Sequence, residues 1–169
     1  MSNSTLCNFY SKSMLVLLGV FAMLGLTQAA CPSNSGRFQA SDAEVTDTRT
    51  GLIWQRCSVG QVWDGTGCSR AARTDMTYEE ALRYASSNAG LQGWRLPDIK
   101  ELFSLADKGC QNPAIDSAAF PNTLINLYWS SSPDVGTSNS AWTVYFAYGK
   151  VDAQNRNNSF AARLVRASQ

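Results

Sequence analysis

The sequence predicts an exported α+β domain with two helices, small antiparallel sheets, long loops and disulfide staples. Two segments begin with helix-capping patterns, and several short stretches between Gly-, Ser- and Asn-rich joints have the composition of β-strands. An apolar leader precedes four of the five cysteines, and an even number of cysteines in an oxidising compartment favours disulfides.

Residues 1–30 have the features of a signal peptide. Lys12 is followed by an uncharged apolar run at 14–26, and residues 27–30 (TQAA) supply small side chains for cleavage. This run would make a helix of about 20 Å, which is too short to span a bilayer comfortably. We therefore expect residues 31–169 to form one domain in the periplasm, in the medium or on the surface of a bacterium.

Cys31 follows the expected cleavage site directly and has two interpretations. A lipoprotein carries its lipid on a cysteine at this place, although Gln28 stands where such signals usually have an aliphatic residue. In the other interpretation Cys31 forms a disulfide. A membrane is an expected partner only if Cys31 is lipidated.

The charge balance of the mature chain limits the kinds of partner that we expect. Without Lys12, thirteen basic and thirteen acidic residues remain. A nucleic-acid-binding domain needs a strong basic field, so no nucleic acid is expected as a partner. The mature length of about 139 residues is enough for one domain with a real core.

The cysteine spacing predicts two disulfides. Cys57 and Cys68 bracket ten residues with turn signals at 64–67 (DGTG), so closing this loop costs little entropy. Cys31 and Cys110 then pair by remainder. A zinc site is the alternative, but the spacings include no CxxC pair.

A hairpin is expected over 38–55, with strands at 43–46 and 52–54. The turn between them ends in Gly51, which can take the positive φ of a bulged hairpin. Asp47 and Arg49 are charged residues of this turn, and turn chemistry explains them better than a charged site does.

Both helices are predicted from their N-terminal signals. Thr77 and Glu80 form a capping box for a helix over 78–88. Asp98 and Glu101 form another for a helix that begins at about Ile99 and ends near residues 108–109 (KG).

The C-terminal third is predicted to carry strands at 128–131, 142–146 and 160–166. A turn is expected at 148–150, and the polar run at 152–159 contains no core residue. Trp63 has no clear assignment. The tryptophans assigned to the core are Trp54, Trp94, Trp129 and Trp142.

Five motifs occur in order along the chain. They are DTRTGLIW at 47–54, the cysteine loop with WDG at 63–65, GWRLP with IKEL at 93–102, YWSSS at 128–132 and RLVR at 163–166. This series closely resembles the Lcl C-terminal domain family over nearly all of the mature chain. The resemblance implies an exported protein with a C-type-lectin-like fold, related in fold to formylglycine-generating enzymes. In the adhesin that names the family, this domain is implicated in binding sulfated glycosaminoglycans.

No enzymatic function is expected. The absence of histidine removes Ser-His-Asp and Cys-His systems, and formylglycine generation would need free cysteines that here serve as staples. A hydrolytic carboxylate pair stays open. The acidic residues that could form it are Asp98, Glu101, Asp107 and Asp116.

No metal or other cofactor is predicted. Calcium lectins use clustered oxygen ligands and carry a Glu-Pro-Asn or Gln-Pro-Asp triplet, which this chain lacks. Calcium is therefore not expected, although the sequence does not exclude it.

The binding hypothesis rests on the C-terminal third, where from Trp142 onward the chain has four basic residues and a single acidic one, Asp152. Tyrosine supplies rigid contact area, and asparagine and serine fit varied polar ligands. The expected ligand is a glycan, with a sulfated polyanion as one form, or a cell-surface protein. The predicted ligand-binding residues are Tyr145, Tyr148, Lys150, Asn155, Arg156, Asn157, Asn158 and Phe160.

Three alternatives accompany this hypothesis. The chain could be a structural or assembly domain of an envelope or appendage protein. The run at 155–159 could be a solvated loop, with Arg163 and Arg166 as structural ion-pair partners. The same segment could be diversified by a retroelement, which a near-copy of its coding DNA beside a reverse-transcriptase gene would reveal.

Overall fold

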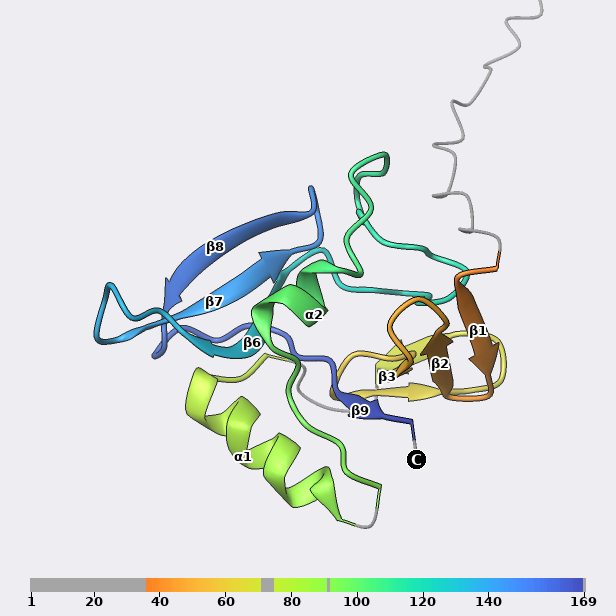
Figure 1. The fold of residues 1–169 in the computed structure, drawn as a ribbon, viewed down its shortest axis with the longest axis horizontal. Helices are drawn as coiled ribbons and strands as arrows, with labels where there is room; N and C mark the ends of the chain where they lie inside the picture. Colours follow the sequence, from red (N-terminus) through yellow and green to blue (C-terminus); the bar gives the residue numbers. More distant parts are fainter. Residues whose placement is uncertain (1–35, 71–74, 91, 169) are drawn as a thin grey trace, which may run out of the picture.

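The computed structural model describes residues 36–70, 75–90 and 92–168. In these ranges it holds two helices and three antiparallel sheets, which confirms the α+β class (Figure 1). The predicted signal peptide at 1–30 and Cys31 lie outside the described residues. Within them, no helix is long and apolar enough to cross a membrane.

The first sheet brings the two ends of the domain together. Its order is β1 (Phe38–Ser41), β2 (Glu44–Asp47), β3 (Leu52–Gln55) and β9 (Val165–Ala167), all antiparallel. The predicted hairpin is therefore confirmed, and the last strand adds to its inner edge. In Figure 1 this sheet lies on the right, with the C-terminus beside β9.

Asp47 explains the tight turn between β2 and β3. Its carboxylate is fully buried and accepts two hydrogen bonds from Arg37, at 2.7 and 3.1 Å, and one from the backbone amide of Arg49. Burial alone would raise the pKa of Asp47, but these hydrogen bonds outweigh it and lower the pKa below its usual value. Gly51 closes the turn at a φ of 71°. Turn chemistry is thus the role of Asp47.

Helix α1 (Tyr78–Ala89) matches its predicted range to within one residue. The side chain of Thr77 accepts from the amide of Glu80, and the Glu80 carboxylate accepts from the amide of Thr77. The helix turns Ala81 and Ala85 toward a core formed with Trp94, Leu96 and Trp129.

Helix α2 (Ile99–Phe103) has the predicted Asp98–Glu101 capping box but ends earlier than predicted. The amides of Leu105 and Ala106 bond three residues back, and the amide of Asp107 then bonds to the carbonyl of Ala114. This long-range pairing replaces the helical hydrogen bonds that the sequence pattern alone would have continued to residue 108.

The second sheet consists of β6 (Leu127–Pro133), β7 (Ser140–Tyr145) and β8 (Lys150–Asn155). Strand β8 was not predicted, because its residues are polar. It is the outer strand of its sheet, and an edge exposed to water needs no apolar alternation. The predicted strand at 160–166 was too long, since only β9 is regular and residues 160–161 make isolated bridges.

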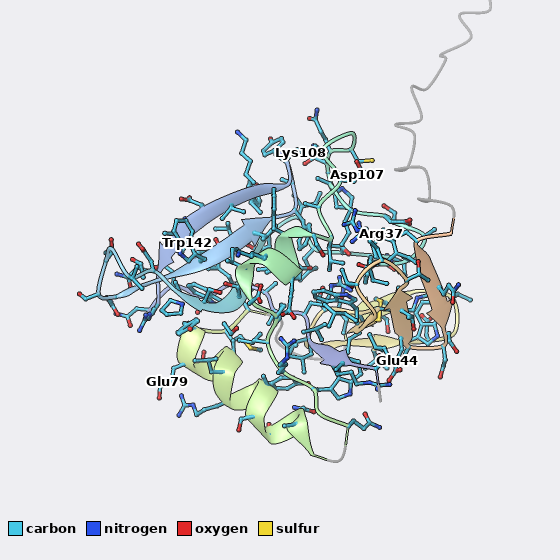
Figure 2. The ribbon with its side chains drawn as sticks, in the orientation of Figure 1. Arg37, Glu44, Glu79, Asp107, Lys108 and Trp142 are labelled. Atoms are coloured by element: carbon cyan, nitrogen blue, oxygen red, sulfur yellow. A yellow bond between two sulfur atoms is a disulfide. The ribbon has the colours of Figure 1, made fainter. Side chains whose placement is uncertain are left out.

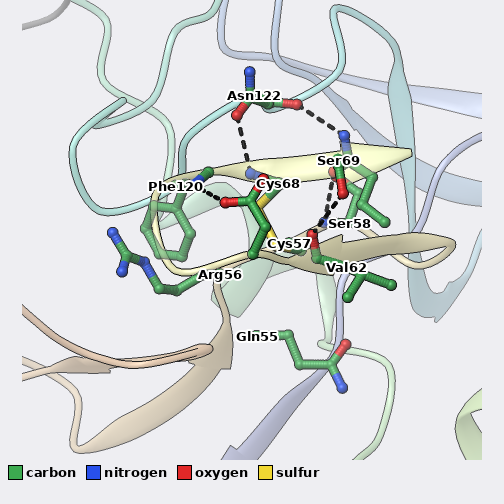
Figure 3. The surroundings of a disulfide bond; sticks show 12 residues. Gln55, Arg56, Cys57, Ser58, Val62, Cys68, Ser69, Phe120 and Asn122 are labelled. Carbon is green, nitrogen blue, oxygen red and sulfur yellow. Dashed lines mark hydrogen bonds between the residues drawn. A yellow bond between two sulfur atoms is a disulfide. The ribbon is translucent and has the colours of Figure 1, made fainter. Parts of the chain in front are cut away.

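The short hairpin of β4 (Gln61–Trp63) and β5 (Cys68–Arg70) is stapled to the first sheet. Cys57 and Cys68 form the predicted disulfide, with their Cα atoms 5.4 Å apart (Figure 3). Cys110 is also disulfide-bonded. Its predicted partner Cys31 lies outside the described residues, so that pairing stays a prediction.

Three of the four tryptophans assigned to the core are buried there: Trp54 and Trp129 at 0 % exposure and Trp94 at 5 %. The assignment of Trp142 was wrong, because its side chain is only partly buried. Val144 packs with Leu102 under α2, whereas Trp142 stands two residues nearer the outer end of β7 (Figure 2).

Candidate ligand-binding groove

The predicted ligand-binding residues lie at two ends of strand β8. Tyr145, Tyr148 and Lys150 lie around its start, Asn155 is its last residue, and residues 156–158 follow it. A strand of this length spans about 17–20 Å, so the two groups form separate surfaces.

The group at the start of β8 is an exposed aromatic patch. The rings of Tyr145 and Tyr148 meet edge to face at 5.6 Å, and the Lys150 ammonium lies 5.9 Å from the Tyr148 ring centre. Gly149 has a φ of 61°, and a Cβ added there would lie 3.3 Å from that of Ala106. The turn therefore rests closely on the 106–114 loop and holds Tyr148 at the surface.

The group at the end of β8 borders a groove of about 460 Å³, which we name the Arg156 groove. One wall is the first turn and a half of α1, and the other is the loop before β7 together with the turn after β8. Its lining residues are Thr77, Tyr78, Glu79, Leu82, Asn139, Arg156 and Asn157.

Arg156 is held in place while keeping part of its guanidinium available. Its Nε donates to the carbonyl of Ser140 at 3.1 Å, and its guanidinium carbon lies 5.1 Å from the ring centre of Tyr78. Its two Nη groups have no hydrogen-bond partner among the described residues. They are the donors that a ligand in the groove can use.

Tyr78 is a fixed wall of the groove. Its hydroxyl donates to the carbonyl of Ser131 at 2.8 Å, and its amide donates to the carbonyl of Arg156 at 3.1 Å. Burial raises the pKa of Tyr78, and nearby Arg156 opposes this only in part. The ring therefore stays neutral and serves as a contact surface.

Asn155 and Asn157 differ in role. The side-chain oxygen of Asn155 accepts from the amide of Asn157 at 2.9 Å and from the Nδ2 of Asn139 at 3.2 Å. Asn155 therefore shapes the turn. The side chain of Asn157 is exposed and unbonded within the described ranges, as is that of Asn158.

Phe160 and the two late arginines are built into the domain. The Phe160 ring packs 5.1 Å from that of Trp129, and Arg166 makes the expected ion pair, with Glu44 at 2.8 Å. Arg163 is not an ion-pair partner in the described structure. It is fully buried and donates to the carbonyls of Gln55 and Arg56, so backbone oxygens take the place of a carboxylate.

The four acidic residues considered for hydrolysis are divided between two places. Asp98 and Glu101 form the capping box, and Arg95 also donates twice to Glu101 at 2.7 Å. Asp107 and Asp116 line a separate cavity of about 190 Å³. Among the described residues, no group of three or more His, Cys, Asp or Glu could hold a metal ion.

Tyr78, Leu82 and Asn139 belong to the groove but were not predicted as site residues. Tyr78 and Arg156 are far apart in the sequence, and no local pattern connects them. The capping box predicted that Tyr78 begins a helix, but it gave no sign that the ring of Tyr78 also borders a groove.

The fold is that of a small disulfide-stapled α+β domain, and the groove lies between its first helix and one end of its second sheet. Residues 43–166 match the model of the Lcl C-terminal domain, so the chain belongs to this family, as predicted from its motifs. The match runs from just before β2 into β9 and includes the whole groove. No curated protein matches the chain in a sequence comparison.

Proposed function

We propose that this protein is an exported binding module, adhesin-like or receptor-like, that recognises a glycan in the Arg156 groove. The observation that carries the proposal is the Arg156 guanidinium, fixed by Ser140 and Tyr78 with its Nη groups open to the groove. The proposal includes a C-type-lectin-like architecture, supported by the small antiparallel sheets and the disulfide, and no catalytic step or cofactor.

The groove offers one cation, one carboxylate and two amides. A guanidinium forms paired hydrogen bonds with sulfate or carboxylate, so Arg156 would take an acidic group of the ligand. Glu79 lines the same groove and repels anions, but it accepts hydrogen bonds from hydroxyls. This combination fits a hydroxyl-rich chain whose acidic groups are spaced apart.

A polymer could also use the aromatic patch at the other end of β8. A glycan longer than about 20 Å would reach from Arg156 to Tyr148 and Lys150 along the exposed strand. Two weak contacts on one polymer reinforce each other, because the second is made at a high effective concentration. A bacterial surface or the space outside the cell is where such ligands are met, and the disulfide is compatible with that location.

The test is binding of residues 31–169 to a glycan array that includes sulfated polysaccharides, at low and raised salt. Arg156→Ala should weaken binding about tenfold or more, because a charge-assisted hydrogen bond is lost. Arg49→Ala is the matched control. It removes the same charge from a turn of the other sheet, where the side chain is exposed and unbonded within the described residues.

Three outcomes distinguish the candidates. Salt-sensitive binding that is lost in Arg156→Ala and kept in Arg49→Ala supports the groove. Equal losses in both variants would mean a diffuse charge effect and would overturn the site. Binding to no glycan would overturn the function and favour a surface-protein ligand or an assembly role.

A further inference from the structure

A second cavity lies apart from the Arg156 groove, on a different side of the domain. It has a volume of about 290 Å³, close to the lower end of small-molecule sites, and is an open cavity lined by β2, β3, the β4 hairpin, α1 and the segment after α1. In Figure 2 Glu44 marks this cavity and Glu79 marks the groove, on different sides of the molecule. We name it the Trp63 cavity.

Trp63 supplies a rigid aromatic wall. The guanidinium of Arg56 lies over its ring, 3.9 Å from the ring centre, but Arg56 is not part of the cavity lining. Trp63 therefore meets the cavity with a part of its indole that Arg56 leaves open. Arg56 is itself fixed, because it donates to the carbonyls of Ala118 and Ala119 at 3.0 and 3.1 Å.

The hairpin that carries Trp63 is firmly anchored. Trp63 pairs with Cys68 across the hairpin, and the disulfide ties Cys68 to Cys57. Asn122 accepts from the amide of Cys68 at 3.0 Å, and its carbonyl accepts from the side chain of Gln61 at 3.2 Å (Figure 3). A wall fixed in this way loses little freedom when a ligand binds.

Glu44 and Gln55 supply neighbouring polar groups. They are direct partners in the β2–β3 register, so their side chains leave the same face about 5 Å apart. One carboxylate oxygen of Glu44 accepts from Arg166, and the other has no partner within the described residues. The side-chain amide of Gln55 makes no hydrogen bond in the described structure, and the side chain points away from the disulfide in Figure 3.

The chemistry of this lining selects its ligand. Glu44 is the only residue of the lining that is charged at neutral pH, and its ion pair with Arg166 at 2.8 Å neutralises it, so the lining offers no free cation to a sulfated or otherwise anionic group. The Glu44 oxygen accepts from a hydroxyl, and the Gln55 amide both donates and accepts, as a pair of adjacent hydroxyls requires. An indole surface packs against the C–H face of a sugar ring.

We infer that the Trp63 cavity binds one uncharged sugar residue, stacked on Trp63 and hydrogen-bonded through adjacent hydroxyls to Glu44 and Gln55. This site is separate from the Arg156 groove, and the inference does not depend on the function proposed for that groove. A chain with both would hold a neutral sugar on one side and an acidic group on the other.

The test is titration of residues 31–169 with lactose, maltotriose, cellotriose and chitotriose, followed by saturation-transfer NMR and tryptophan fluorescence. At least one of these should bind in the millimolar range, unchanged by raised salt and by Arg156→Ala. Gln55→Ala should weaken it about tenfold, because one paired hydrogen bond is lost. Since the Gln55 side chain bonds to no described residue, this variant should fold normally.

Gln39→Ala is the matched control, because Gln39 is an exposed glutamine on β1 of the same sheet. Trp63→Ala should abolish the fluorescence change as well as binding. The inference is overturned if none of the four sugars binds, if Gln55→Ala and Gln39→Ala bind alike, or if binding disappears in raised salt. None of these results bears on the polyanion test of the groove.

Discussion

At the scale of single residues, Arg163 is a buried cation whose described partners are all neutral. It donates to the carbonyls of Gln55 and Arg56 and to the hydroxyl of Thr123 at 2.9 Å, and burial lowers its pKa. Its guanidinium also lies 4.9 Å from the ring centre of Phe120. Arg163 therefore fastens the start of the cysteine loop to the core from a segment far along the chain, just before β9.

Replacing Arg163 tests that role. Arg163→Met fills a similar volume but leaves two buried carbonyls without a donor, so the free energy of unfolding should fall by about 3 kcal/mol. Urea unfolding at neutral pH measures it. Arg49→Met, on an exposed turn, should change stability by less than about 0.5 kcal/mol. Equal stability of the two variants would contradict the role assigned to Arg163.

Asp47 should give the domain a stability that depends on acid pH. Because its folded pKa is lowered, its contribution is complete above the unfolded value of about 4 and is lost as the pH falls through the folded value. Glu101 adds to the same slope, since its hydrogen bond from Arg95 lowers its pKa. Asp47→Asn should therefore make the decline in melting temperature below pH 4 shallower without removing it. A slope identical to that of the parent chain would refute this.

At the scale of elements, the capping signals were reliable because they act within four residues. Both capping boxes form as predicted from Thr77–Glu80 and Asp98–Glu101. Strand β8 was missed because it faces water on an outer edge, and the end of α2 was misplaced because a carbonyl of a distant loop, that of Ala114, binds the amide of Asp107. Local signals thus fixed where helices begin, and tertiary pairing decided where regular structure ends.

The cap of α2 can be tested with a matched pair of variants. Asp98→Ala removes the acceptor for the amide of Glu101, which lies 2.8 Å away, and should cost about 1 kcal/mol of unfolding free energy. Asp98→Asn keeps an oxygen acceptor and should cost only a few tenths. Thermal unfolding of both variants separates the cap from the charge. If Asp98→Asn lost as much as Asp98→Ala, charge and not capping would be the cause.

At the scale of the whole molecule, each candidate site is assembled from parts that lie far apart in the sequence. Five motifs in order along the chain were enough to predict the family, the turn signals at 47–51 predicted the first hairpin, and the cysteine spacing predicted the Cys57–Cys68 disulfide. The Arg156 groove could not be predicted from the sequence, because one of its walls comes from α1, which lies far from Arg156 along the chain. The ligand-binding residues were predicted as one cluster because they are close in the sequence. In the structure, strand β8 separates them into two groups, one at each of its ends.

The disulfide provides a prediction that separates the two sites. Replacing both Cys57 and Cys68 by alanine frees a short loop and should lower the free energy of unfolding by about 2–3 kcal/mol. Trp63 sits on the freed hairpin, directly opposite Cys68, whereas the Arg156 groove is built from α1 and the second sheet. At a temperature where the variant is folded, neutral-sugar binding should therefore weaken more than polyanion binding. Parallel titrations with both ligands measure the two affinities. An equal loss of affinity at both sites would contradict the prediction and would mean that the loop supports the whole domain, not only one wall of the Trp63 cavity.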